Sequence, residues 1–389
     1  MEDLVRTGQP ARGAPSSRAE VVERDLERTA ARLEEEFDAM AGDRVLLTGG
    51  AGFLGYYLVQ SVLHRNAAVE ADRRVRLTVA DNFSRGLPGW LEERRGTAEL
   101  TVLEHDVTRP LPEAAGAFDW VLHAASIASP TVYRRRPIDT MDANVGGLRR
   151  LLDRCRAQQE GGDPVKGFLF FSSSEVYGDP DPEHIPTPES YWGRVSFTGP
   201  RACYDESKRF GETLCVNFAR VHDLPVRAVR PFNNYGPGLG LDDRRVIPDF
   251  ARDVLAGRDV VLLSDGSPTR TFCYVSDAVV GYYRALVRGA DGEAYNVGTD
   301  GPEVSMAELA EDVVRIGGEL FGYEGRVVRE ESGDPEYLTD NPDRRCPDIG
   351  KAGRELGYEP EVGLDEGLRR SLLWYAGGEG APAGAEERR

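Results

Sequence analysis

The segment Gly49-Gly50-Ala51-Gly52-Phe53-Leu54-Gly55 decides the fold, because it joins the apolar run RVLLT (44–48) to a helical pattern. Glycines at its first, fourth and seventh positions allow a tight turn, close approach of a pyrophosphate and close packing of helix on strand. The amino end of the helix adds free N–H groups and a dipole that favours an anion. A second apolar run ends in Asp81, whose carboxylate can bind an adenosine ribose and would repel a 2′-phosphate. This order of elements predicts a Rossmann-type site for NAD rather than NADP.

Further short apolar runs alternate with helical or loop patterns as far as residue 230. They are VRLTVA (75–80), ELTVLE (99–104), WVLHA (120–124), GFLFF (167–171) and VRAVR (226–230). This alternation is typical of α/β proteins, and we expect a doubly wound parallel sheet with helices on both faces. After about Gly236 the pattern becomes irregular, which predicts a smaller C-terminal α/β domain for the substrate.

The two ends of the chain differ from this core. Residues 1–18 are rich in Gly, Pro, Ser and Arg, and we expect them to be disordered. Apolar residues then recur at helical spacing, at Val22, Leu26, Leu33, Phe37 and Met40. We therefore predict four parts: 1–42, an extension with one amphipathic helix; 43–235, the NAD-binding domain; 236–376, the substrate domain; and 377–389, a flexible tail.

Composition limits the partners and the cellular compartment. The 389 residues carry a formal net charge of −18, which argues against nucleic acid or an anionic membrane surface as a partner. No apolar run is long enough to span a bilayer, and the start MEDLVRTGQP does not resemble a signal peptide. The five cysteines form no C-x-x-C pair and the histidines show no ligand spacing, so we predict no metal site and reduced thiols in a cytoplasm.

Two polar clusters are candidates for chemistry. Tyr204 and Lys208 lie four residues apart in YDESK, on one face of a predicted helix. A free phenol has a pKa near ~10, and a neighbouring ammonium together with the nicotinamide ring would favour the phenolate. In FFSSSEVYG (170–178) an apolar strand ends in three hydroxyls and a carboxylate, which cost energy unless partners or a ligand satisfy them.

Together TGGAGFLG, FSSSEVYG, YDESK and RPFNNYGP resemble the extended short-chain dehydrogenase/reductase family that acts on nucleotide sugars, over roughly residues 43–375. The resemblance implies that Ser173 binds the reacting hydroxyl beside Tyr204. It also implies a homodimer formed through helices near 145–158 and 204–220. We expect the NAD contacts to come from Gly49, Gly52, Phe53, Leu54, Gly55, Asp81, Asn82, Asp106, Val107, Tyr204 and Lys208.

Within that family, Ser174 and Glu175 distinguish the subgroups. Nucleotide-sugar 4,6-dehydratases carry an aspartic acid at the position of Ser174, so the acid for water loss is missing here. Simple 4-epimerases usually lack the glutamate. The Ser-Glu pair and the segment YWGRVSFTGPRACYDESKR (191–209) resemble the UDP-glucuronate decarboxylases. The sequence departs from their usual Asn-Pro-Ile at residues 196–198, which read SFT.

The resemblance therefore implies oxidation of UDP-glucuronate at C4, loss of carbon dioxide and return of the hydride to give UDP-xylose, with some release of UDP-4-keto-pentose. The implied catalytic residues are Ser173, Glu175, Tyr204, Lys208 and Arg270. The implied substrate contacts are Ser129, Tyr133, Glu175, Asn233, Arg245, Arg270 and Arg345. Two alternatives are a UDP-glucuronate 4-epimerase and a non-catalytic NAD-dependent sensor or scaffold. The complete Ser173, Tyr204 and Lys208 set argues against the sensor.

Overall fold

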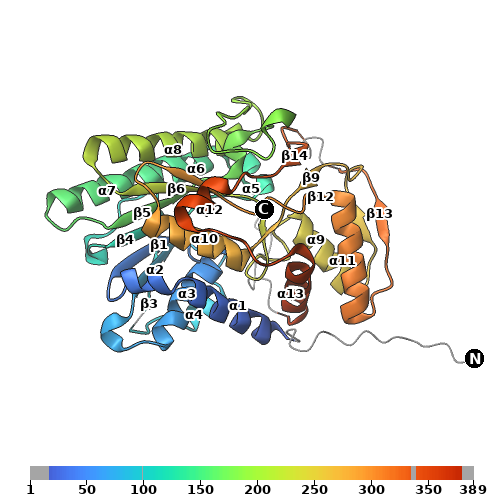
Figure 1. The fold of residues 1–389 in the computed structure, drawn as a ribbon, viewed down its shortest axis with the longest axis horizontal. Coiled ribbons are helices and arrows are strands. Elements are labelled where there is room, and N and C mark those ends of the chain that lie inside the picture. The colour runs from blue at the N-terminus through green and yellow to red at the C-terminus, as the bar shows by residue number, and fades with distance from the viewer. Residues whose placement is uncertain (1–16, 99, 334–338, 379–389) are drawn as a thin grey trace, which may run out of the picture.

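The computed structural model describes residues 17–98, 100–333 and 339–378, and its centre is a seven-stranded parallel sheet (Figure 1). The strand order is β11-β6-β5-β4-β1-β2-β3. The strands are β1 (Arg44–Thr48), β2 (Arg76–Asp81), β3 (Leu100–Glu104), β4 (Trp120–His123), β5 (Gly167–Phe171), β6 (Val226–Pro231) and β11 (Ala294–Val297). All neighbouring pairs are parallel, which confirms the predicted doubly wound fold.

Helices cover both faces of this sheet, so its strands are apolar on both sides. In β1, Val45 and Leu47 pack against one helix layer and Leu46 against the other. The first layer holds α3 (Phe53–Ala67), α10 (Val275–Arg288) and α12 (Gly350–Leu356); the second holds α7 (Leu148–Glu160) and α8 (Ala202–His222). Short helices α4 (Gly89–Glu92), α5 (Pro130–Arg135) and α6 (Pro137–Met141) lie in the connections.

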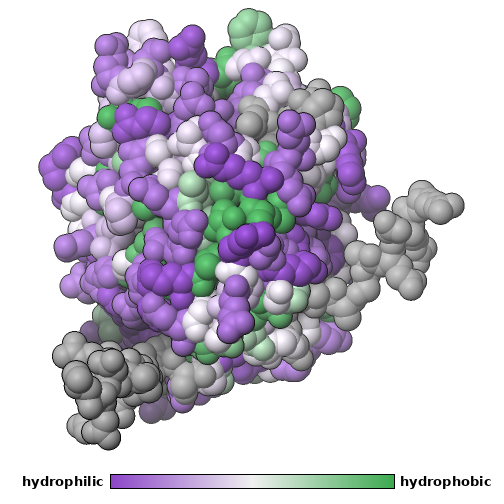
Figure 2. All heavy atoms as spheres, turned by 90° about the vertical axis from the view of Figure 1, so that its right-hand side faces the viewer, coloured by the Kyte–Doolittle hydropathy of each residue, from purple (hydrophilic) through white to green (hydrophobic). Residues whose placement is uncertain are grey.

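A smaller unit with its own apolar core lies beside the sheet, at the right in Figure 1. Its helices are α9 (Val246–Leu255), α11 (Met306–Phe321) and α13 (Leu364–Ala376). Its strands are β7 (Asn234–Tyr235), β8 (Val260–Leu262), β9 (Thr269–Arg270), β10 (Cys273–Tyr274), β12 (Val304–Ser305), β13 (Val327–Arg329) and β14 (Arg344–Arg345). Figure 2 shows that this side of the molecule is mainly hydrophilic, with a limited apolar area near its centre.

Strand β11 and helices α10 and α12 follow residue 236 but belong to the large sheet and one of its helix layers. Strand β11 pairs with β6, and α10 packs against β5, β6 and α3. The chain thus leaves the large sheet after β6 and returns to it before it completes the smaller unit. The division at residue 236 remains a prediction about domains, and the sheet itself contains residues from both sides of it.

The amino-terminal segment forms two helices where the sequence predicts one: α1 (Arg18–Arg32) and α2 (Glu34–Ala39). Leu33 separates them because its backbone is not helical (φ −112°, ψ 19°). Asp25 of α1 is fully buried and accepts hydrogen bonds from Tyr57 (2.5 Å), Tyr274 (2.6 Å) and Arg370 (2.5 Å). These contacts fasten α1 to both units. The predictions for residues 1–16 and 379–389 lie outside the described residues.

Candidate active site

The glycine loop between β1 and α3 has the geometry of an anion cradle. Gly49 has φ +75°, and a Cβ there would lie 2.6 Å from the Cα of Ala125. A Cβ on Gly55 would lie 2.3 Å from the carbonyl oxygen of Gly50, so helix and loop are in close contact. A Cβ on Gly52, at the amino end of α3, would meet only the Gly49 oxygen at 3.3 Å. The space before the helix is therefore open, and the loop fits a pyrophosphate.

Asp81 ends β2 beside this loop. Its carboxylate accepts hydrogen bonds from the backbone N–H groups of Ala51 (3.0 Å) and Phe83 (2.9 Å). Burial raises the pKa of Asp81, and those N–H groups act in the opposite direction. A carboxylate has about four acceptor positions, so two used by the backbone leave others for ribose hydroxyls. The residue thus fixes the loop and fits an adenosine ribose.

Asp106 and Val107 follow β3 on the side predicted for adenine. Asp106 accepts hydrogen bonds from the N–H (2.9 Å) and hydroxyl (2.8 Å) of Thr108. Partial burial raises its pKa, but the hydrogen bonds from Thr108 and Asn82 outweigh this and leave the pKa lowered. Val107 is buried against Gly147, where a Cβ would approach it to 2.8 Å. The glycine loop leaves space for the pyrophosphate, and Asp81 and Asp106 keep acceptor positions for the ribose and the adenine. The residues therefore fit NAD.

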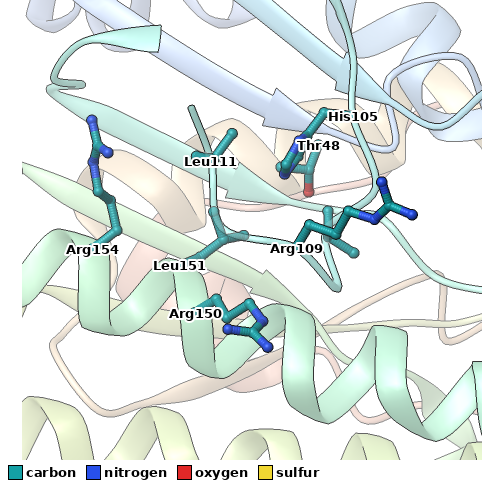
Figure 3. A pocket seen from close by; sticks show the side chains of 8 residues that line it. Thr48, His105, Arg109, Leu111, Arg150, Leu151 and Arg154 are labelled. Atoms are coloured by element: carbon teal, nitrogen blue, oxygen red, sulfur yellow. The ribbon is translucent and has the colours of Figure 1, made fainter. Parts of the chain in front are cut away.

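A small cavity lies next to Val107, between the sheet and α7 (Figure 3). Thr48 and His105 point toward each other from the ends of β1 and β3, while Arg150 and Arg154 come from α7. Its volume of about 10 Å³ admits no more than one water molecule. We assign it no ligand, and no group of acidic, cysteine or histidine side chains in the described residues is arranged to hold a metal ion.

The hydroxyls after β5 have separate partners. Ser172 donates to Glu212 (2.5 Å). Ser173 accepts from the backbone N–H of Glu175 (3.2 Å) and also hydrogen-bonds Tyr204. Ser173 thus caps the 3₁₀ turn Ser174–Tyr177 and contacts the predicted base, while Ser174 is buried within the turn. The strand end therefore serves both as a turn and as one wall of a site.

Tyr204 and Lys208 share the buried face of α8. The Lys208 ammonium donates to the carbonyl of Phe171 (2.7 Å) and lies 5.7 Å from the centre of the Tyr204 ring. Burial lowers the pKa of Lys208 to about 7. Tyr204 stacks on Tyr133, with ring centres 5.0 Å apart and planes at 13°.

The protein alone does not lower the pKa of Tyr204. Burial raises it to about 12, although the hydrogen bond with Ser173 lowers it. The expected acidifying effect of Lys208 is thus smaller than the cost of burying the phenolate. The second positive charge in the prediction is that of the nicotinamide ring, which belongs to the cofactor.

Glu175 is held by two arginines. Arg345 makes a two-pronged contact with its carboxylate (2.8 and 2.7 Å), and Arg201 adds a third contact at 2.7 Å. Burial would raise the pKa of Glu175, but Arg345 and Arg201 hold it well below its usual range. The sequence reasoning missed Arg201, and it placed Arg345 on the nucleotide rather than on Glu175. The only available signal for Arg201 was its spacing of four residues from Asp205.

Arg270 lies directly opposite Arg345 in the β9–β14 pair. Its Nη1 donates to the carbonyls of Thr269 (2.7 Å) and Asp343 (2.9 Å), and its Nη2 donates to that of Pro342. Of five guanidinium donors, these contacts leave the Nε–H and one Nη2–H. Burial, followed by Arg345, lowers the pKa of Arg270 to about 9. An anion bound to the Nε–H and the remaining Nη2–H, the free edge of the guanidinium, would reduce the free-energy cost of burying its charge.

The remaining predicted contacts lie around the same region. Ser129 immediately precedes α5, the helix that carries Tyr133. Asn233 adopts φ +39° and donates to the carbonyl of Thr271 (2.9 Å). Arg245 immediately precedes α9 and pairs with Asp243 (2.9 Å), and its charge opposes the rise that burial causes in the pKa of Tyr204. Their roles in binding a nucleotide remain predictions, as does the role assigned to Arg345.

Known proteins share this sequence and fold. UDP-glucuronic acid decarboxylase 3 of Arabidopsis thaliana is 39% identical over 325 residues, covering 84% of this chain and 86% of that protein. A UDP-glucose 4-epimerase from Thermotoga maritima, solved with UDP-glucose, superposes with a TM-score of 0.72 at 26% identity, covering 85% of this chain and 98% of its own. A dTDP-glucose 4,6-dehydratase from Streptomyces venezuelae, solved with NAD, has a TM-score of 0.71 at 27% identity. The match covers 85% of this chain and 96% of that one.

The family profile agrees with these relatives and with the glycine loop. It matches residues 45–298, a span that begins in β1 and ends just after β11. The chain belongs to the NAD-dependent epimerase/dehydratase family.

Proposed function

We propose that this protein is an NAD-dependent decarboxylase that converts UDP-glucuronate to UDP-xylose through a UDP-4-keto intermediate. The observation that carries the proposal is the buried surplus of positive charge beside Ser173 and Tyr204. Arg201 and Arg345 contact the buried carboxylate of Glu175, and the buried Arg270, whose charge also interacts with the exposed Asp343, lies beside them. A buried cation needs a counter-ion, and the C6 carboxylate of the substrate supplies one at the free edge of Arg270.

The first chemical step concerns C4 of the sugar. Bound NAD supplies the reversible removal and return of the C4 hydride. Tyr204 accepts the proton of the C4 hydroxyl, and Ser173 hydrogen-bonds the same oxygen. Lys208, held by the Phe171 carbonyl, lies next to the base, where its ammonium would hydrogen-bond the nicotinamide ribose. The cofactor contacts that we propose are those predicted above from Gly49 to Lys208.

The 4-keto acid can then lose carbon dioxide. The C5–C6 bond breaks, and its electron pair is accommodated as an enolate whose oxygen lies at C4. Ser173 and Tyr204 donate hydrogen bonds to that oxygen, which is an oxyanion-hole type of stabilisation. C5 then takes up one proton, for which Glu175 orients the sugar or a water molecule. Arg270 fixes the departing carboxylate until the bond breaks.

The alternatives differ at named residues. A 4,6-dehydratase needs an acid where Ser174 is buried. A 4-epimerase would have to hold the 4-keto acid without losing carbon dioxide, and solved 4-epimerases share the fold. The identity to a decarboxylase is higher, at 39% against 26%, so decarboxylation is the better-supported reaction. A sensor would have no use for a complete Ser173, Tyr204 and Lys208 set.

Assembly and location belong to the same proposal. We place a homodimer interface on α7 and α8 and the adjoining α6. Ile138 of α6 (62% exposed) and Phe210 of α8 (50% exposed) present apolar side chains there, and α6 packs against α8. The five thiols are free, as in a reducing cytoplasm. No helix in the described parts of the chain is both long enough and apolar enough to cross a membrane.

Incubation with UDP-glucuronate and NAD, followed by mass spectrometry and absorbance of NADH, tests the reaction. We expect UDP-xylose, with NADH accumulating only in step with released UDP-4-keto-pentose. A product that keeps all six sugar carbons and is inverted at C4 would establish the epimerase instead. Absence of any turnover with UDP-sugars would favour the sensor.

A further inference from the structure

Segment 236–245 joins β7 to α9 and contacts both units of the molecule. A Cβ on Gly238 would lie 2.9 Å from the Cβ of Tyr56 and 3.1 Å from the carbonyl oxygen of Phe53, so the segment packs against the first turn of α3. Leu241, three residues further on, packs against the apolar core of the smaller unit. The segment therefore runs from the helix that follows the glycine loop to the first helix of the smaller unit.

Asp243 in this segment is a buried carboxylate with a cationic partner from each unit. Its side chain is only 2% exposed. The Oδ1 atom lies 2.6 Å from Nη1 of Arg85, and the Oδ2 atom lies 2.9 Å from Nε of Arg245. Arg85 belongs to the loop after β2 in the large unit, whereas Arg245 immediately precedes α9 in the smaller one. One carboxylate thus connects the two arginines.

The loop that carries Arg85 is fixed by residues on the cofactor side. Asp81 accepts a hydrogen bond from the backbone N–H of Phe83 (2.9 Å), and the Asn82 side chain accepts one from the backbone N–H of Ser84 (3.1 Å). Asp81 and Asn82 are two of the predicted NAD contacts. The residues that would hold the cofactor therefore also set the backbone that precedes Arg85.

Arg245 lies on the other side of Asp243, toward the catalytic base. Its charge acts on Tyr204, where it opposes the effect of burial on the pKa. The ion pair with Asp243 uses Nε, so within the described residues the Nη donors remain for a ligand. Two guanidinium groups around one carboxylate also leave a surplus of positive charge. A phosphate group of the substrate is the anion that complements such a surplus.

We propose that Asp243 is a positioning residue, which holds Arg245 toward a phosphate of the nucleotide sugar and ties that placement to the cofactor loop through Arg85. The inference rests on the proposed function, which assigns Arg245 to the nucleotide. A long side chain loses conformational entropy when it binds a ligand, and a fixed carboxylate removes part of that cost beforehand. Arg85 restrains the carboxylate in turn. An exposed arginine of the cofactor-binding unit therefore affects the affinity for the substrate without contacting it.

The test is a double-substitution cycle measured by calorimetry, with UDP as the probe and NAD at saturation. We expect R85Q to weaken UDP binding by about threefold, the scale of a partly exposed ion pair. R245Q should weaken it by about tenfold, the scale of a hydrogen bond to a charged group. Because Arg85 acts through Arg245, the double variant should bind UDP no more weakly than R245Q alone. Loss of a positive charge acting at long range would instead add to the effect of R245Q.

R95Q is the matched control, because Arg95 lies in the same connection between β2 and β3, is exposed and pairs with Glu92. It should leave the Kd of UDP unchanged. In turnover, R85Q should raise KM for UDP-glucuronate about threefold and leave kcat unchanged, a split that a general structural defect would not produce. D243N should raise KM by about tenfold. The exposed R85Q keeps the inference testable in the case in which D243N does not fold.

An unchanged Kd in R85Q would overturn the inference, as would a threefold loss that persists in the R245Q background. An equal loss in R95Q would overturn it as well. Failure of the unmodified protein to bind UDP in the presence of NAD would instead overturn the proposed function.

Discussion

Replacement of Arg270 by lysine removes the feature that would distinguish a glucuronate from a neutral sugar. Lysine keeps the charge but loses the planar edge formed by the Nε–H and the free Nη2–H. The substitution also removes up to three hydrogen bonds to backbone carbonyls, those of Thr269, Pro342 and Asp343. A two-pronged contact with a carboxylate is worth roughly 1.5–3 kcal/mol, which corresponds to about 10- to 150-fold in kcat/KM.

The assay measures kcat/KM for UDP-glucuronate and, separately, the Kd of UDP by calorimetry. We expect a loss within that range for R270K and a Kd for UDP within about threefold of the original. The matched control is R344K on the neighbouring strand β14, opposite Thr269, because Arg344 is exposed and pairs only with Glu303 among the contacts described. Equal losses in turnover and in UDP affinity would show a structural defect, and a loss of turnover below about threefold would refute carboxylate recognition by Arg270.

Three other variants test the cofactor site, the base and the amino-terminal helix. Y204F should lower turnover by about 10²–10⁴-fold while the Kd of UDP stays nearly unchanged, and a smaller loss would point to another base. D81A should weaken NAD binding, because the carboxylate holds the N–H groups of Ala51 and Phe83. It should also raise the ratio of NADP affinity to NAD affinity, because the carboxylate repels a 2′-phosphate. An unchanged ratio in a fluorescence titration would contradict this. D25N should lower the free energy of unfolding, measured in urea, by about 3 kcal/mol. This is the lower end of the range for breaking a buried ion pair, because Arg370 retains its ion pair with Glu366. The exposed D38N, in the same segment, should leave the free energy of unfolding nearly unchanged.

The part of the fold that could be predicted is the part with local signals. Six strands of the large sheet were recognised as apolar runs, and each occurs within a residue or two of its expected bounds. The edge strand β11 was missed because Ala294–Val297 is short and half polar. Its position follows from pairing with β6, more than 60 residues earlier, and nothing in its own sequence marks that pairing. The break between α1 and α2 depends on the backbone of one residue, Leu33.

The candidate site divides in the same way. The glycine loop and the position of Lys208 beside Tyr204 follow from motifs whose residues are close in sequence, and the contact of Ser173 with Tyr204 follows from the family resemblance. The clamp on Glu175 does not, because Arg345 reaches it across 170 residues and Arg201 across a loop. The direction of the Tyr204 pKa also escaped prediction. Spacing indicated a nearby ammonium, whereas only the folded structure shows how deeply the phenol is buried.

The contacts of Asp25 have a consequence for how the chain is made. During synthesis α1 leaves the ribosome long before its charged partner Arg370, which follows Asp25 by 345 residues. Until then Asp25 has only hydroxyl partners, and α1 has no α13 to pack against. After it is made, α1 can pack against α3, but the part of its surface that contacts α13 stays uncovered until α13 has been synthesised. The contacts of Asp25 are therefore complete only after α13 has been made, well after the dinucleotide-binding sheet.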